Sequence, residues 1–194
     1  MLLAKSCHDI DWIHYILNEK CTKISSFGNL KHFNSKNKPE GASQRCLDCK
    51  VENTCPYSAK KIYLNRVKEG KLGWPTSVII ENGDIPDIEN VTDSLKTTDY
   101  GRCVYDSDND VVDNQVVIME FESKCTATFS MISTTKKQHR QTRIFGSLGQ
   151  IEIDDAKIQH TDFLKGTTKD VIYESTYPKD SKMHGKFSEL TFKI

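Results

Sequence analysis

The sequence predicts an α+β fold with an open, mainly antiparallel sheet and helices packed on one face. Three observations support this fold class. Apolar residues recur at helical spacing in the first half of the chain, and the period changes to two after Arg102. No Gly-x-Gly-x-x-Gly turn links a strand to a helix, as a parallel dinucleotide-binding sheet would require. Helices that come early and strands that come late are typical of an α+β domain.

Length and charge narrow the class of protein. The chain has 194 residues, with 27 basic and 27 acidic side chains, so its net charge is zero. A domain of this length can bury its own core. A chain without net charge lacks the excess of basic residues that attracts nucleic acid or an anionic membrane, so we expect neither as a partner. The seven cysteines are an odd number and no signal-peptide pattern is present, which favours a reducing, cytoplasmic location.

The first helix is expected over residues 6–17. Its core-facing side chains recur at helical spacing and are Ile10, Ile13 and Leu17. Lys5, His8 and Asp11 stand at i, i+3 and i+6, so they share the neighbouring stripe of the same helix. A basic side chain, an imidazole and a carboxylate would then point the same way.

A structural interpretation of the same helix start is simpler. Ser6 can cap the helix, and Asp9 three residues later completes a capping-box pattern. His8 is then an ordinary residue of the first turn. Spacing alone favours this interpretation, because short motifs without structural context often match by chance.

The rest of the first half contains one extended segment, one loop and two further helices. Residues 20–33 predict a strand, or a strand pair broken near Gly28. Residues 34–41 lack periodicity and predict a loop. Residues 57–67 predict a second helix, and the Pro-initiated, acidic segment 86–95 predicts a third.

The second half predicts short strands joined by turns. Residues 116–121 and 126–131 alternate between polar and apolar side chains and flank a connection of hairpin length. We expect these two strands to pair antiparallel with one face covered. Four more short strands are expected at residues 142–145, 150–153, 157–160 and 170–173.

A cysteine cluster lies in the polar loop of residues 41–56. Cys46, Cys49 and Cys55 have the spacing C-x2-C-x5-C, and structural zinc would need a fourth ligand beside them. The fourth ligands that the sequence offers are Cys21, His32 and His8. A second C-x-x-C or a pair of histidines is missing, so we expect no metal. We interpret the three cysteines as reduced thiols that pack the loop against the sheet.

Three polar residues before the first late strand admit two interpretations. Arg102, Tyr105 and Asp113 could line a substrate pocket at the edge of the sheet. Charged residues at strand ends are more often solvated, so a surface role competes with the pocket role. The sequence leaves both interpretations open.

Several stretches resemble, in order along nearly the whole chain, the substrate-side domain of one oxidoreductase family. They are LLAKSCHDID (2–11), RCLDC (45–49) with CPYSAKKIY (55–63), GRCVY (101–105) with DNDVVD (108–113), and RIFG (143–146). The family is that of glucose-fructose oxidoreductase, inositol dehydrogenase and MocA (Gfo/Idh/MocA). Its members are NAD(P)-dependent and have an N-terminal Rossmann domain and a C-terminal α+β domain of the glyceraldehyde-3-phosphate dehydrogenase-like type. The resemblance implies such a C-terminal domain over residues 1–176, with 177–194 as a loosely held tail.

The resemblance also implies roles for individual residues. In these enzymes the nucleotide-binding half contributes a lysine from a Glu-Lys-Pro motif, and the second domain contributes an aspartate followed four residues later by a histidine. His8 matches that histidine and would move the proton of the substrate hydroxyl, a task that suits an imidazole. The aspartate position holds Ala4, so the adjacent Lys5 is our candidate for the missing polar function. The expected substrate-binding residues are Asp11, Arg102 and Tyr105.

The nucleotide-binding half is not recognisable in this sequence. The glycines of the segment 146–149 form a turn between strands, with no helix after it to hold a pyrophosphate. We therefore expect NAD or NADP in the context of a full-length enzyme and no cofactor held by this chain alone. The chain would be a substrate-side fragment, inactive alone, that acts on a sugar, polyol or related hydroxyl compound. Its open sheet face would meet a Rossmann domain or a second copy.

A second function comes from a different class of protein. An exposed sheet with a large apolar face is expected to find a partner, whether or not the domain takes part in catalysis. The alternative is therefore a non-catalytic dimerisation or interaction module derived from such an enzyme.

Overall fold

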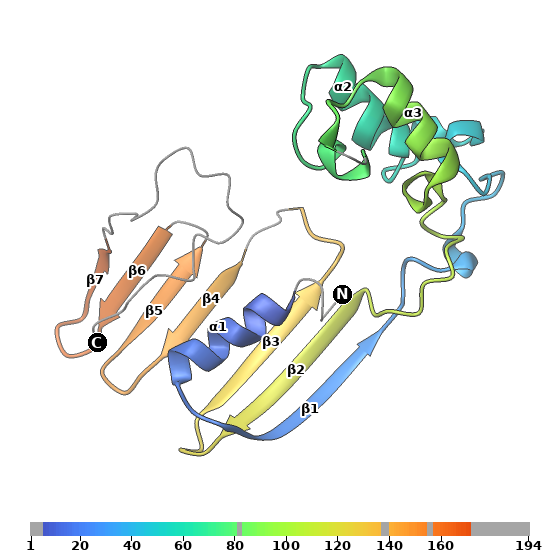
Figure 1. Ribbon diagram of the computed structural model, residues 1–194. Coiled ribbons are helices and arrows are strands. Elements are labelled where there is room, and N and C mark those ends of the chain that lie inside the picture. Colours follow the sequence, from blue (N-terminus) through green and yellow to red (C-terminus); the bar gives the residue numbers. More distant parts are fainter. Residues whose placement is uncertain (1–5, 81–82, 137–139, 155–156, 172–194) are drawn as a thin grey trace. The chain divides into compact units, whose positions relative to one another are not determined.

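The computed structural model describes residues 6–80, 83–136, 140–154 and 157–171, and these form an α+β fold (Figure 1). The helices are α1 (Cys7–Leu17), α2 (Asn65–Lys68) and α3 (Ile88–Thr97). The strands are β1 (Cys21–Asn29), β2 (Asn114–Phe121), β3 (Thr126–Ile132), β4 (Gln141–Phe145), β5 (Gly149–Asp154), β6 (Lys157–Asp162) and β7 (Thr167–Asp170). All the described strands pair antiparallel, in two sheets of order β1-β2-β3 and β4-β5-β6-β7. The chain divides into two compact units, Met1–Ser133 and Thr134–Ile194.

Helix α1 covers one face of the three-stranded sheet, as its apolar spacing predicts (Figure 1). The packed side chains are, from α1, Ile10, Ile13 and Leu17 and, from β2, Val117, Met119 and Phe121. The alternate residues Val116 and Ile118 of β2 are 43% and 47% exposed. The predicted hairpin of β2 and β3, with one covered and one open face, is therefore confirmed.

Strand β1 runs without a break through Gly28, so of the two alternatives the single strand is confirmed and the broken pair is wrong. Gly28 pairs with Gln115 of β2, and a Cβ at Gly28 would lie 2.9 Å from the backbone oxygen of Asn114. The glycine allows this close approach of two strands and does not end the strand.

The helical part of the first unit has its own core. The buried residues of this core are Cys46, Ala59, Ile79, Val91 and Leu95. The helix expected over residues 57–67 begins later, as a π-helical turn over Lys60–Leu64 that leads into α2. Helix α3 begins with a capping box in which the Asp87 carboxylate accepts the Asn90 backbone N–H and the Asn90 side chain accepts the Asp87 backbone N–H.

The second unit contains the sheet of strands β4 to β7. Its buried side chains are Ile153 and Ile158, which face each other across β5 and β6. The strand expected at residues 170–173 is displaced, because β7 is Thr167–Asp170. The β-branched residues Thr167 and Thr168 favour a strand, and the turn before β7 ends at Gly166 with φ +62°. The expected tail of residues 177–194 lies outside the described residues.

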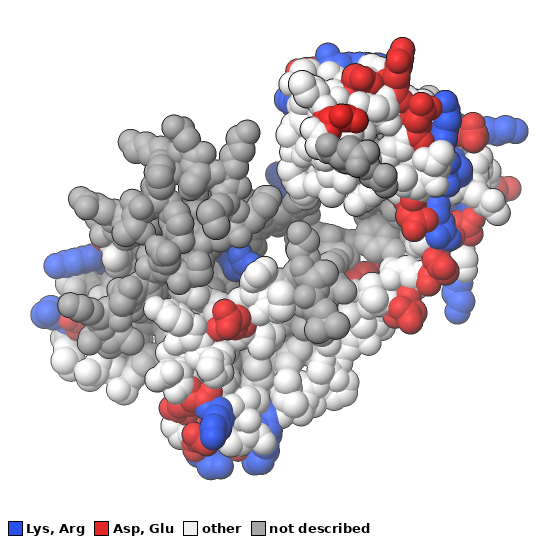
Figure 2. Space-filling model, in the orientation of Figure 1, with Lys and Arg blue, Asp and Glu red and all other residues white. Residues whose placement is uncertain are grey.

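Surface charge is mixed. On the face shown in Figure 2, acidic and basic side chains are interspersed, and no large area has a single sign. In the part of the chain that the structure describes, no helix has the length and apolar character needed to cross a membrane.

Candidate functional site

The predicted catalytic helix exposes its histidine. His8 and Asp11 are exposed side chains one turn apart on α1, whereas the stripe of Ile10 packs on the sheet. Both polar groups are accessible to a substrate or a second domain. Lys5 and Ala4 lie outside the described residues.

The predicted capping role of Ser6 is wrong. Ser6 is buried and has helical backbone angles (φ −77°, ψ −5°), and its side chain makes no capping hydrogen bond. A capping side chain normally requires an extended backbone at that position, which directs its oxygen toward the free N–H groups of the first turn. The structural interpretation of the segment 6–9 therefore loses its main support.

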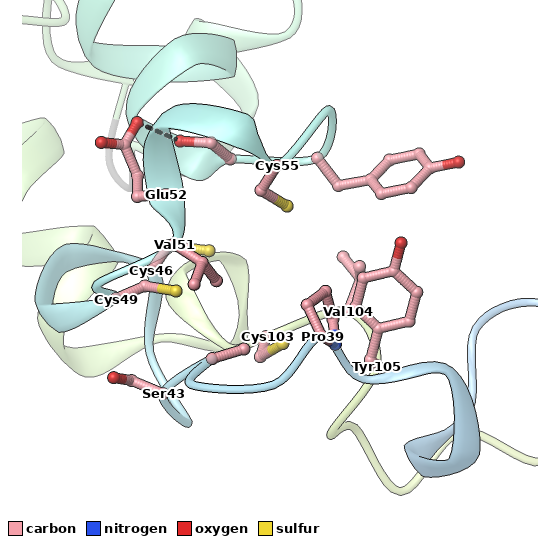
Figure 3. A pocket seen from close by; sticks show the side chains of 13 residues that line it. Pro39, Ser43, Cys46, Cys49, Val51, Glu52, Cys55, Cys103, Val104 and Tyr105 are labelled. Carbon is pink, nitrogen blue, oxygen red and sulfur yellow. Dashed lines mark hydrogen bonds between the residues drawn. The ribbon is translucent and has the colours of Figure 1, made fainter.

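Four thiols line one pocket in the helical part of the first unit (Figure 3). Three come from the predicted cluster of Cys46, Cys49 and Cys55, and the fourth is Cys103, about fifty residues later in the chain. Figure 3 shows the four sulfur atoms around a common space, with the ring of Tyr105 at one side. All seven cysteines of the chain are free thiols.

The chemistry of this pocket does not favour a nucleophilic cysteine. Burial raises the pKa of the Cys46 thiol, and the three neighbouring thiols of the pocket raise it further. Among the described residues that line the pocket, none is Lys, Arg or His. A reactive cysteine needs a nearby cation or helix N-terminus that favours the thiolate. The raised pKa of Cys46 therefore argues against a nucleophilic role for this thiol.

Arg102 lies at the surface beside this pocket. Its guanidinium pairs with Asp99 at 3.3 Å and Asp108 at 3.2 Å, and the hydrogen bond that it donates to Asp99 is the main cause of its raised pKa. The same side chain lines a shallow polar hollow with Gln44, Arg45 and Asp106. An exposed ion pair of this kind contributes little to stability, so the guanidinium can exchange its partners for a polar ligand at low cost.

Tyr105 is buried in an aromatic cluster. Its hydroxyl lies 3.3 Å from Nε2 of His32, and its ring contacts those of His32 and Tyr57 at centroid distances of 5.5 and 6.0 Å. Burial raises the pKa of the Tyr105 hydroxyl. This side chain borders the thiol pocket and faces little solvent, with 6% of its surface exposed.

The carboxylate of Asp113 is held by hydrogen bonds within the fold. It accepts the backbone N–H groups of Lys31, His32 and Phe33 at 3.0, 2.5 and 3.1 Å, and the Asn114 side chain at 2.8 Å. Burial works to raise the pKa of this carboxyl, but the hydrogen bonds outweigh burial and lower the pKa to about 2. Asp113 fixes the start of the loop after β1, and no acceptor capacity is left for a substrate hydroxyl without breaking this loop.

A comparison with models of protein families shows the family of this chain. The family model described as the C-terminal alpha/beta domain of an oxidoreductase family, Gfo/Idh/MocA, matches residues 1–187. The chain belongs to the Gfo/Idh/MocA family. It forms the C-terminal domain of that family, and its α+β fold with antiparallel sheets agrees with this assignment. No curated protein and no solved structure matches the chain.

The structure brings some of the predicted site residues of this Gfo/Idh/MocA domain together. His8 and Asp11 share α1, and Tyr105 joins the predicted cysteines at the thiol pocket. The roles of His8, Lys5, Asp11, Arg102 and Tyr105 in substrate binding or catalysis stay predictions.

Sequence reasoning missed the fourth thiol of the pocket. None of the three suggested partners, Cys21, His32 and His8, is among its described lining residues, whereas Cys103 is. No local spacing connects Cys103 to the loop of residues 41–56, so only a contact between the two segments could have shown it. As the chain stands, no group of three or more His, Cys, Asp or Glu among the described residues is placed to hold a metal ion.

Proposed function

We propose that the chain is the substrate-binding and catalytic half of an NAD(P)-dependent oxidoreductase that acts on a sugar, polyol or related hydroxyl compound. The observation that carries the proposal is the family match over residues 1–187, together with a first helix that exposes His8 and Asp11. Family membership supports oxidoreductase chemistry, and the exposed imidazole of His8 is of the side-chain type most often used as a general acid or base.

The nicotinamide cofactor belongs to another part of the proposed enzyme. A dinucleotide site needs parallel strands and a free helix N-terminus for the pyrophosphate. The strands that the structure describes are antiparallel, and the N-terminus of α3 is closed by the carboxylate of Asp87. These residues do not fit NAD(P), so we assign the cofactor and the hydride transfer to a nucleotide-binding half.

Two exposed residues of α1 have a defined task in the proposed enzyme. His8 exchanges a proton with the substrate hydroxyl, and Asp11, one turn later, accepts a hydrogen bond from a second hydroxyl. Lys5 lies outside the described residues, and its part in this surface rests on its sequence spacing from His8 alone. A polyhydroxylated substrate matches such a surface, because hydroxyl groups donate to carboxylates and exchange protons with imidazole.

The function is tested by assembling the two halves. The chain is produced together with the nucleotide-binding domain of a Gfo/Idh/MocA enzyme, and reduction of NAD⁺ or NADP⁺ is followed by absorbance with a panel of sugars and polyols. Turnover with a hydroxyl compound supports the proposal. Assembly without turnover of any member of the panel favours the second candidate function.

That second function is a non-catalytic module that associates with a copy of itself through the open face of the first sheet. The exposed apolar side chains of this face are Phe27, Val116, Ile118 and Ile132. Phe27 and Val116 stand directly opposite each other in β1 and β2, so they form a continuous apolar strip. Monomeric proteins rarely leave such a strip exposed without a binding role.

A single charge in this strip should disrupt the association. Because burying a lysine in an apolar interface is costly, we expect Ile118→Lys to weaken self-association at least tenfold, measured by analytical ultracentrifugation. The matched control is Val78→Lys, since Val78 is 53% exposed and lies outside the strip. A wild-type chain that is monomeric at all accessible concentrations would contradict self-association through this face.

A further inference from the structure

We propose that Cys46, Cys49, Cys55 and Cys103 form a tetrathiolate site for a zinc ion. Four thiols from two distant segments line one pocket, and soft thiolate ligands select zinc among the divalent metals common in cells. The remaining cysteines, Cys7, Cys21 and Cys125, are exposed side chains outside this pocket. The proposal is independent of the oxidoreductase function, because its test measures bound metal and not turnover.

The two segments that carry the thiols are tied together next to the pocket. The backbone N–H of Cys103 donates to the Gln44 carbonyl at 2.8 Å, and Arg45 and Arg102 form an isolated β-bridge. The Arg45 guanidinium also donates to the carbonyls of Leu95 and Thr98, both at 2.6 Å. These bonds hold together the two segments that carry Cys46 and Cys103. Both of these cysteines are buried.

The chain just before Cys103 is pressed against the end of α3. A Cβ at Gly101 would lie 1.7 Å from the backbone oxygen of Leu95, so only glycine fits there. This close approach sets the position from which Cys103 enters the pocket.

The other two thiols lie where the chain can adjust. Cys49 follows the short 3₁₀ turn Cys46–Asp48, Cys55 follows the turn Glu52–Thr54, and both side chains are only partly buried. Zinc–sulfur bonds are about 2.3 Å long, so tetrahedral thiolates stand roughly 4 Å apart. No such ligand group is assembled among the described residues, so the proposal requires the partly buried side chains of Cys49 and Cys55 to turn toward Cys46 and Cys103 as the ion binds.

Charge and proton balance are consistent with this site. Binding breaks four S–H bonds, forms four zinc–sulfur bonds and releases four protons to solvent, which leaves a net charge of about −2 at the centre. Lys38, paired with Asp106 at 2.7 Å, lies close enough to Cys103 and Cys49 that the thiols contribute to its raised pKa, after the larger effect of Asp106. Its ammonium group is a cation near the proposed centre.

The test is metal analysis of the whole chain, purified without a metal-binding tag under reducing conditions. We expect about one zinc per chain, a loss of at least tenfold in bound zinc for Cys49→Ser, and no change for the control Cys125→Ser, whose thiol is exposed. Cobalt titrated into the metal-free wild type should give the intense absorption of a tetrahedral thiolate complex. This readout does not depend on how the variants fold.

Two results would overturn the proposal. The first is a wild-type chain that holds less than about one-tenth of a zinc and gives no cobalt–thiolate absorption. The second is iron with acid-labile sulfide in place of zinc, because an iron–sulfur cluster spreads its four ligands more widely than a single ion does.

Discussion

Replacing His8 by asparagine should lower kcat of the assembled oxidoreductase by about 10²- to 10⁴-fold, the range that removal of a general acid–base group typically produces. Asparagine keeps a polar side chain but cannot exchange a proton near neutral pH. Because the His8 side chain is exposed, the substitution should leave the thermal midpoint of the chain unchanged. Steady-state kinetics of the assembled enzyme measure the effect.

The matched control for this variant is His14→Asn. His14 is also an exposed histidine of α1, but it lies six residues later and faces a different direction around the helix. We expect its replacement to change kcat less than twofold. Equal losses in the two variants, or a loss below tenfold for His8→Asn, would remove the acid–base role from His8.

The second large effect concerns Asp113. Its replacement by alanine should lower the unfolding free energy of the first unit by about 3 to 5 kcal/mol. The reason is that three backbone N–H groups lose the charged acceptor that the buried Asp113 carboxylate provides. Chemical denaturation at pH 7 measures the loss. The control is Asp108→Ala, which removes only an exposed ion pair with Arg102 and should cost less than about 1 kcal/mol.

The Asp113 contribution should also depend on pH in a defined direction. Its folded pKa of about 2 lies below the ordinary value of 3.8, so the native state favours the ionised carboxylate. The stabilisation is therefore fully present above pH 4 and is lost as the pH falls from about 4 to about 2. The difference in unfolding free energy between wild type and Asp113→Ala should shrink over that interval. A difference that stays constant down to pH 2 would show that the carboxylate is not the stabilising form.

The elements that the sequence predicted well depend on local periodicity. The stripe of Ile10, Ile13 and Leu17 predicted the buried face of α1, and the alternation in residues 116–131 predicted the β2–β3 hairpin with its covered face. In each case, one repeated spacing is enough to assign the element and its buried side.

The features that sequence analysis missed depend on contacts between distant residues. The sequence left open whether β1 continues through Gly28, because this depends on the approach of Asn114. The role of Asp113 depends on N–H groups about eighty residues earlier in the chain. Cys103 joins the pocket only because the Arg45–Arg102 bridge brings two loops together. Such contacts leave no mark in the local spacing of residues. At Ser6 a local pattern was misleading. The sequence has a good capping pattern there, but the backbone does not adopt the capping geometry.

We infer that this chain supplies the substrate side of an oxidoreductase and that another half binds the nicotinamide cofactor. The decisive experiment is titration of NADH and NADPH into the purified chain, followed by nicotinamide fluorescence and calorimetry. We expect no binding up to about millimolar concentration for the chain alone, where an affinity of 1 mM corresponds to about −4 kcal/mol. Micromolar binding by the chain alone would contradict it, because these residues would then form a dinucleotide site themselves.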